Sequence, residues 1–152
     1  LPYDPRGPPM NYLDTSALVK RFVTEKGSDL VSAMVGSGEP IGTAKIAYTE
    51  IFSGLARRRR ASELSGLAYA SVCERFETDW PLYVRVDLRD EILSLARQLI
   101  ERHPLRGFDA IHLASAMTLR SALEEEVTFV AADARLLQAA EGEGLQTLNP
   151  EG

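Results

Sequence analysis

Apolar and polar residues follow two different spacings along this chain. Residues 10–13 and 127–132 are short, largely apolar runs of strand length. Between residues 44 and 55, apolar side chains instead recur at i, i+3, i+4, i+7, i+8 and i+11, which is typical of an amphipathic helix. The same reasoning predicts further strands at 40–43, 82–86 and 146–148, and further helices at 16–23, 28–35, 62–78, 90–102, 108–119 and 134–140.

Predicted strands and helices therefore alternate along the chain. Parallel strands need long crossover connections, which helices supply, so the alternation predicts an α/β fold. We expect three layers, with helices on both faces of a central parallel sheet of four to five strands. With 152 residues and no internal repeat or linker, the chain fits a single domain.

The first nine residues differ from the rest, because they carry four prolines and no hydrophobic period. We expect residues 1–9 to be a non-native or disordered extension and the domain to span residues 10–150. No apolar run approaches the roughly 18 residues that a membrane span needs, so we expect a soluble, cytoplasmic protein with no membrane partner. The single Cys73 cannot form an internal disulfide and is expected to be a buried structural thiol.

Four acidic residues take comparable places in this pattern. Asp14 and Asp133 each end a predicted strand, Asp109 lies in the first turn of a helix, and Glu50 lies in the first turns of another. Each has an ordinary interpretation alone, as a helix cap or a solvent-facing residue. In open α/β sheets, however, ligands bind at the carboxyl ends of the strands, where these acids would meet.

Carboxylates gathered in one cleft repel one another and raise one another's pKa unless a cation compensates their charge. Hard oxygen ligands without His or Cys favour Mg²⁺ or Mn²⁺. Such an ion can activate a water molecule and stabilise the leaving oxygen during attack on a phosphodiester. The four acids together therefore indicate a metal-dependent nuclease.

The basic residues are unevenly placed. The formal net charge is −5, but residues 1–120 hold 16 Lys and Arg against 15 Asp and Glu, so the acidic excess lies beyond residue 120. The dense basic run is Arg57, Arg58, Arg59 and Arg60. It is either a solvated helix end whose cations complement the helix dipole or a contact for the phosphates of a nucleic acid.

Four segments resemble, in order, the acidic motifs of PIN-domain proteins. They are residues 11–20 (NYLDTSALVK), 49–50 (TE), 106–116 (RGFDAIHLASA) and 129–133 (FVAAD). Within that family the chain is most similar to the VapC-type toxins of type II toxin-antitoxin systems. The fourth motif departs from the family pattern, because Ala132 stands where a Thr or Ser often precedes the acid.

The resemblance implies a PIN-like α/β/α domain with endoribonuclease activity that depends on Mg²⁺ or Mn²⁺. Its substrate would be structured RNA, such as tRNA or rRNA, cleaved by attack of a metal-activated water on a phosphodiester. The resemblance also implies a homodimer and a cognate VapB-type antitoxin. By motif matching, the catalytic and metal-site residues are Asp14, Glu50, Asp109 and Asp133, and the supporting hydroxyls are Ser16 and Thr15. In this interpretation the run from Arg57 to Arg60 contacts the RNA backbone.

Alternatives stay open for one histidine and for the function. His112, three residues after Asp109, is either a hydrogen-bonded core histidine or a residue that orients a group of the site, whereas His103 is a polar helix terminus. The alternative function is a PIN-like scaffold that binds RNA or protein without cleaving it. A phosphoacceptor domain of the haloacid-dehalogenase type would need an Asp at position 16, where this chain has Ser16.

Overall fold

The computed structural model describes residues 10–152, so the expectation for residues 1–9 lies outside the described residues. All neighbouring strands pair in parallel, in one five-stranded sheet of order β3-β2-β1-β4-β5. The predicted α/β class with a parallel sheet is confirmed. The strands are β1 (Met10–Leu13), β2 (Ile41–Ala44), β3 (Val84–Val86), β4 (Val127–Val130) and β5 (Gln146–Leu148).

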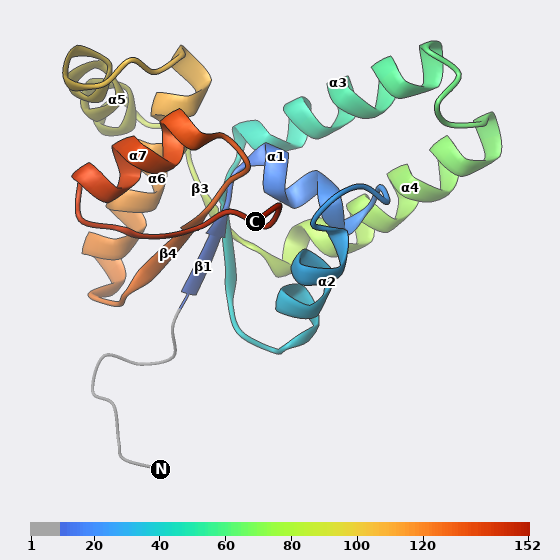
Figure 1. Cartoon of the computed structure of the whole chain (residues 1–152), viewed down its shortest axis with the longest axis horizontal. Helices are drawn as coiled ribbons and strands as arrows, with labels where there is room; N and C mark the ends of the chain where they lie inside the picture. The colour runs from blue at the N-terminus through green and yellow to red at the C-terminus, as the bar shows by residue number, and fades with distance from the viewer. Residues whose placement is uncertain (1–9) are drawn as a thin grey trace.

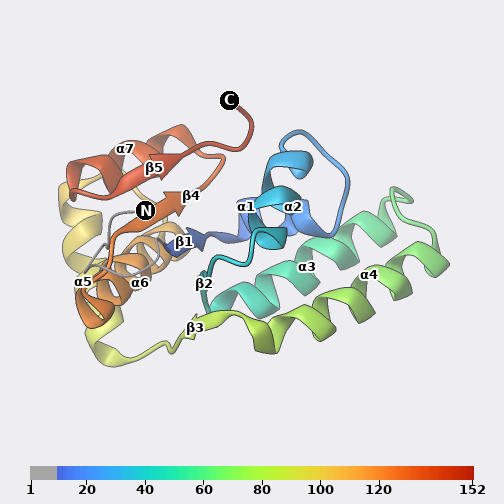
Figure 2. The same ribbon diagram turned by 90° about the horizontal axis from the view of Figure 1, so that it is seen from below.

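Helices cover both faces of the sheet, as Figure 2 shows from below. On one face lie α1 (Thr15–Leu18), η1 (Val19–Arg21), α2 (Ser28–Gly36), α3 (Ile46–Arg60), α4 (Gly66–Asp79) and η2 (Trp80–Leu82). On the other lie α5 (Asp90–Arg102), α6 (Gly107–Leu123) and α7 (Ala134–Gly142). The α3–α4 pair is long and antiparallel and extends away from the sheet (Figure 1). Across residues 10–152, none of the helices combines the length and apolar character needed to cross a membrane.

The central strands β1 and β4 divide their side chains between two cores. Tyr12 and Phe129 belong to the core under α5, α6 and α7, and their ring centroids lie 5.4 Å apart. Leu13 and Val130 belong to the core that contains α1 to α4. All four side chains are fully buried. Because helices cover both faces, these strands are apolar on both sides, which explains their continuous apolar runs.

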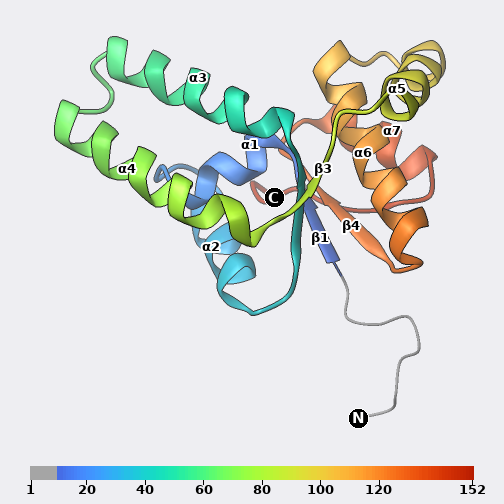
Figure 3. The same cartoon turned by 180° about the vertical axis from the view of Figure 1, so that it is seen from behind.

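The order of the strands reverses beside β1. The chain proceeds outward from β1 through β2 to the edge strand β3, which Figure 3 shows between the α3–α4 pair and α5. It then returns to form β4 on the other side of β1 and continues outward to β5. The connections that follow β1 and β4 therefore diverge, and such a switch point opens a crevice at the carboxyl ends of the strands.

Three local expectations are wrong. The helix expected over residues 16–23 is the short α1 followed by the 3-10 turn η1. The helix expected from residue 62 begins at Gly66, because Ser62 has a positive φ of 61° and Ser65 caps α4 by accepting a hydrogen bond from the Ala68 N–H at 3.0 Å. Strand β4 ends at Val130, two residues before the expected end.

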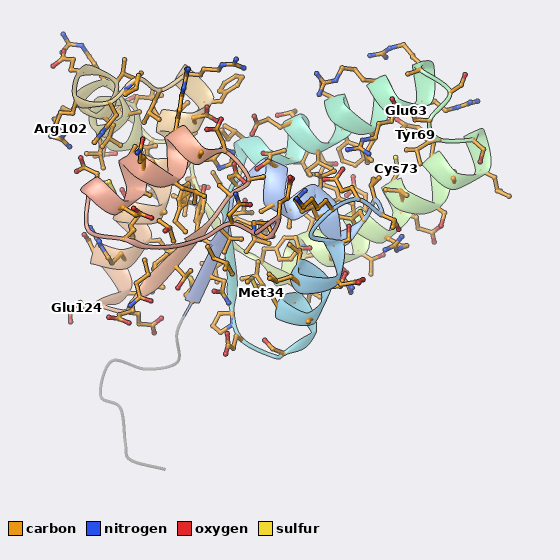
Figure 4. The ribbon with its side chains drawn as sticks, in the orientation of Figure 1. Met34, Glu63, Tyr69, Cys73, Arg102 and Glu124 are labelled. Carbon is orange, nitrogen blue, oxygen red and sulfur yellow. The ribbon has the colours of Figure 1, made fainter. Side chains whose placement is uncertain are left out.

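Cys73 is partly exposed, so the expectation of a buried thiol is also wrong. It lies on α4 near Tyr69 (Figure 4). Helix α4 lies at the margin of the second core and buries Val72 and Phe76. Its remaining surface, Cys73 included, is open to solvent in part.

The Phe129→Ala variant should lower the free energy of unfolding by about 3–5 kcal/mol, because the surrounding core cannot collapse fully into the space that the ring leaves. Urea denaturation followed by circular dichroism measures the change. The matched control is Phe108→Ala, whose ring is 60% exposed. Its loss should change the free energy of unfolding by less than about 0.5 kcal/mol. Equal losses of unfolding free energy in the two variants would contradict the placement of Phe129 in the core.

Candidate active site

Asp14 is a buried carboxylate at the end of the central strand. It follows β1 and caps α1, with Oδ1 accepting hydrogen bonds from the Ser16 hydroxyl at 2.7 Å and the Ala17 N–H at 2.9 Å. The residue is only 4% exposed. Burial raises the pKa of Asp14, and the charge of Asp109 adds to the rise, although His112, Ser16 and the Ala17 amide oppose it. Both described hydrogen bonds end on Oδ1, so Oδ2 is the oxygen available to a cation.

Ser16 links the first acid to the strand beside it. Its hydroxyl donates to Asp14 and accepts from the Ala132 N–H at 3.2 Å. The Asp14 N–H in turn donates to the Val130 carbonyl at 3.1 Å. The ends of β1 and β4 are therefore joined by two hydrogen bonds. The Ala132 backbone makes one of them, although this position lacks a hydroxyl.

Glu50 is held by a chain of hydrogen bonds that begins in the core. Glu50 Oε1 accepts from the Thr15 hydroxyl at 2.6 Å and lies 2.9 Å from His112 Nε2. His112 Nδ1 lies 2.8 Å from the Tyr12 hydroxyl. A carboxylate can only accept, so Nε2–H donates to Glu50. In the neutral form of the ring, Nδ1 then accepts from the Tyr12 hydroxyl.

The protonation of this chain follows from its surroundings. Burial raises the pKa of Tyr12 well above its usual range, so the phenol stays protonated. Burial also raises the pKa of Glu50, but the hydrogen bonds from His112 and Thr15 outweigh it, and the net shift is downward. Glu50 therefore stays ionised at neutral pH. The expectation of a hydrogen-bonded core histidine is confirmed, and His112 orients Glu50 as well.

Asp109 and Asp133 lie nearer the surface. Asp109 is in the first turn of α6, half-buried. Burial raises its pKa first, and the nearby charge of Asp133 raises it further, while His112 and Arg106 oppose the rise. Asp133 is exposed and caps α7, accepting from the Arg135 N–H at 2.8 Å and the Leu136 N–H at 3.2 Å.

Three of the four predicted acids line one cleft of about 630 Å³. Asp133 does not line it, but shares with Asp109 two adjoining depressions of about 370 and 500 Å³, the larger of which also includes Glu50. The structure thus brings the acids to one edge of the sheet with Asp133 at its margin. The charged and polar residues that line the main cleft include Asp14, Thr15, Ser16, Glu50, Arg57, Arg58, Arg106, Asp109 and His112.

The predicted arginine run divides between the cleft and other surroundings. Arg57 and Arg58 line the cleft, whereas the Arg59 guanidinium lies over Gly66 at the start of α4 and Arg60 is exposed outside the cleft lining. Arg106 lines the cleft and both depressions, and sequence reasoning missed its role. The available signal was its position as the first residue of the third acidic motif.

An ion-pair network holds the guanidinium group of Arg58 in place. Its guanidinium lies 2.7 Å from Glu25, which also pairs with Lys20 Nζ at 2.9 Å. Lys20 is only 3% exposed and makes a second ion pair, at 2.7 Å, with Glu151 near the carboxyl end. The network thus contains two cations and two carboxylates, so its charges balance, and Arg58 is held at the cleft by Glu25.

The donor chemistry of the cleft fits a hard divalent cation. The acids and hydroxyls supply oxygen atoms, which Mg²⁺ and Mn²⁺ prefer. The upward pKa shifts of Asp14 and Asp109 are those of carboxylates whose charge lacks full compensation. Within residues 10–152, no three Asp, Glu, His or Cys side chains are already grouped as an ion-binding set.

Comparison with known proteins gives the class of this fold and site. The profile of the PIN domain family matches residues 12–142, and the chain belongs to that family. It is 35% identical over 111 residues to the Mycobacterium tuberculosis (strain CDC 1551 / Oshkosh) protein named Ribonuclease VapC45. The aligned region covers 73% of this chain and 77% of the relative. The predicted relationship to VapC ribonucleases is confirmed.

Solved structures agree on the fold. FitAcB from Neisseria gonorrhoeae superposes with a TM-score of 0.69 at 18% identity, covering 93% of this chain and 98% of that chain. A toxin-antitoxin complex from Klebsiella pneumoniae superposes with a TM-score of 0.65 at 16% identity, covering 92% of this chain and 97% of that chain. The PIN-like three-layer architecture is thus shared although few residues are identical.

Replacing Asp109 by Asn should raise the free energy of unfolding at pH 7 in EDTA by less than about 1 kcal/mol, since the site is partly solvated. The amide removes a charge that burial and Asp133 both disfavour. The pKa of Asp109 is raised in the folded state. Its contribution to stability is therefore fully present below the unfolded pKa of about 4 and is lost as the pH rises through the folded pKa. The variant should lack the part of this fall in stability that Asp109 causes, while the part due to Asp14 remains.

Urea denaturation between pH 4 and pH 7 measures the effect. Asp90→Asn is the matched control, because Asp90 also lies in the first turn of a helix, α5, but is exposed and outside the cleft. It should give no gain. If the free energy of unfolding depends on pH identically in wild type and Asp109→Asn, the raised pKa of Asp109 is contradicted.

Proposed function

We propose that this protein is the toxin of a toxin-antitoxin pair, acting as an endoribonuclease on structured RNA such as tRNA or rRNA. The observation that carries the proposal is the main cleft, which Asp14, Glu50 and Asp109 line together with three arginines. Metal-dependent phosphodiester hydrolysis needs acidic side chains that bind the cation, and arginines that attract phosphate serve to bind the substrate. The VapC45 relative, which is named a ribonuclease, supports it.

The acids would hold Mg²⁺ or Mn²⁺. Asp14, Glu50 and Asp109 are the candidate ligands, and Asp133 is a fourth from the margin. When bound, the ion would activate water and stabilise charge on the phosphate. Ser16 and Thr15 act on the carboxylates rather than on the substrate, because their hydroxyls donate to Asp14 and Glu50 respectively.

Arg57, Arg58 and Arg106 would bind the RNA backbone. Their guanidinium groups are always charged and match the geometry of a phosphate. Together they border the cleft that contains the acids, so phosphate bound by them lies close to the candidate metal site. Such contacts hold the RNA in register but do not read its sequence.

The same proposal includes a protein partner that blocks the site. The Klebsiella pneumoniae structure is a complex of toxin with antitoxin, which supports a cognate VapB-type antitoxin for this chain. A homodimer and a cytoplasmic location, where RNA substrates and reducing conditions for Cys73 occur, complete the proposal. These assignments rest on the relationship to VapC proteins.

Purified protein, freed of copurified partners, should cut a bulk small-RNA preparation into discrete fragments in Mn²⁺ or Mg²⁺. EDTA should abolish the cleavage, and Asp109→Asn should lower it by at least about 100-fold, the scale of losing a group that supports transition-state charge. Gel electrophoresis and sequencing of the fragment ends measure both.

The controls separate this activity from contamination and from the alternative scaffold. Asp90→Asn, outside the cleft, should cut like wild type. Cleavage that survives Asp109→Asn would identify a contaminating nuclease. Binding of RNA without cleavage in either metal would favour the non-cleaving scaffold.

Replacing Arg57 by Gln should weaken RNA binding and lower its salt dependence. The slope of log K against log salt should change by roughly 0.7–0.9 for each phosphate that the variant no longer neutralises. Fluorescence anisotropy with labelled bulk tRNA in EDTA measures it. Arg60→Gln is the matched control, because Arg60 belongs to the same run but lies outside the cleft. Equal slopes for the two variants would show that the run acts only as diffuse charge.

A further inference from the structure

Phe108 is an exposed aromatic ring beside the acids. The chain has five phenylalanines, and the other four all lie within 5.4 Å of another aromatic ring, measured between centroids. No such ring contact is found for Phe108 in the described part of the chain, and it is 60% exposed. It contributes to neither core. Stability therefore does not explain an aromatic residue at this position.

The surroundings of Phe108 are those of the proposed active site. It lies in the first turn of α6 between Arg106 and Asp109. It lines the depression of about 500 Å³ that also contains Glu50, Asp109 and Asp133. An apolar ring, a cation and several carboxylates thus border one hollow that adjoins the main cleft.

This combination fits a nucleotide better than a phosphate alone. Proteins bind single strands by pairing cationic groups, which follow the backbone, with aromatic rings, on which bases stack. A phosphodiester held at the acids by Arg106 would bring one of its flanking bases to the Phe108 side. A paired base already stacks within its helix and cannot lie on the ring, so the base must be unpaired.

We propose that Phe108 is a stacking platform for an unpaired nucleobase next to the scissile phosphate. Stacking on this ring then adds one base contact to the backbone contacts made by the arginines. The inference rests on the proposed ribonuclease function and names the class of site within the substrate. Among the described residues, the other exposed large apolar side chains line neither the main cleft nor this depression. Leu67, which is 86% exposed at the start of α4, is an example.

A short RNA strand that carries one 2-aminopurine tests the platform without any cleavage. In EDTA, wild-type protein should bind the strand and quench its fluorescence, and it should bind the same strand annealed to its complement more weakly. Phe108→Ala should lose the quenching and bind about 5- to 100-fold more weakly, which corresponds to about 1–3 kcal/mol for one stacked base. Phe108→Trp should retain both properties.

Two variants provide the controls. Phe108→Leu keeps an apolar side chain without an aromatic face and should behave like Phe108→Ala, whereas Leu67→Ala should behave like wild type. Equal binding and quenching by wild type and Phe108→Ala would overturn the inference. Binding and quenching by Phe108→Leu at the wild-type level would also overturn it. A third contradicting outcome is a fall in molecular mass on light scattering as the only effect of Phe108→Ala, because the ring would then be a contact between protein molecules.

A cleavage assay in Mn²⁺ separates this inference from the proposed function. If wild type cuts RNA at unpaired sites and Phe108→Ala raises KM at those sites with kcat nearly unchanged, the platform is supported. If wild type cuts RNA but Phe108→Ala has the same KM and the same preference, the platform alone is wrong. If wild type neither binds nor cuts RNA, both the platform and the ribonuclease function are wrong.

Discussion

The burial of one carboxylate, Asp14, at the end of the central strand constrains the rest of the site. An ionised group in such a place loses hydration, which hydrogen bonds or a cation must replace. Ser16 and the Ala17 amide replace part of it, as their bonds to Oδ1 show. The remaining charge is what makes a cation favourable there. The sheet holds this charge in place, because β1 is bonded to neighbours on both sides and cannot move independently.

The second acid depends on the core in a different way. Glu50 projects from α3, whereas His112 and Tyr12 come from α6 and β1. Tyr12 and His112 are fully or almost fully buried, and their hydrogen bonds end on a carboxylate that is 26% exposed. Packing of the core thus sets the orientation of a group in the cleft. A buried network of this kind is favourable only when every member is satisfied, so the neutral form of His112 has one tautomer, with the proton on Nε2 facing Glu50.

Local charge, not the net charge of −5, governs the surface next to the acids. Arg57, Arg58 and Arg106 lie along a cleft whose acids would otherwise repel RNA. Glu25 holds Arg58 at the cleft and also pairs with the buried Lys20, whose second partner is Glu151. Phe108 adds an apolar face to this charged border. A cleft with these three components suits a ligand that is itself acidic on its backbone and aromatic on its bases.

The sequence by itself determined the order of strands and helices, the parallel sheet and the four acids with their place at strand and helix ends. These features follow from local periodicity and chain order, which a sequence states directly. Tertiary structure decided that Arg57 and Arg58 line the cleft while Arg60 does not, and that Asp133 stays at its margin. It also joined His112 to Glu50 across 62 residues of chain. Such choices depend on how each helix packs against elements that are distant in the chain, and the local pattern, which indicates only the buried face of a helix, does not encode that packing.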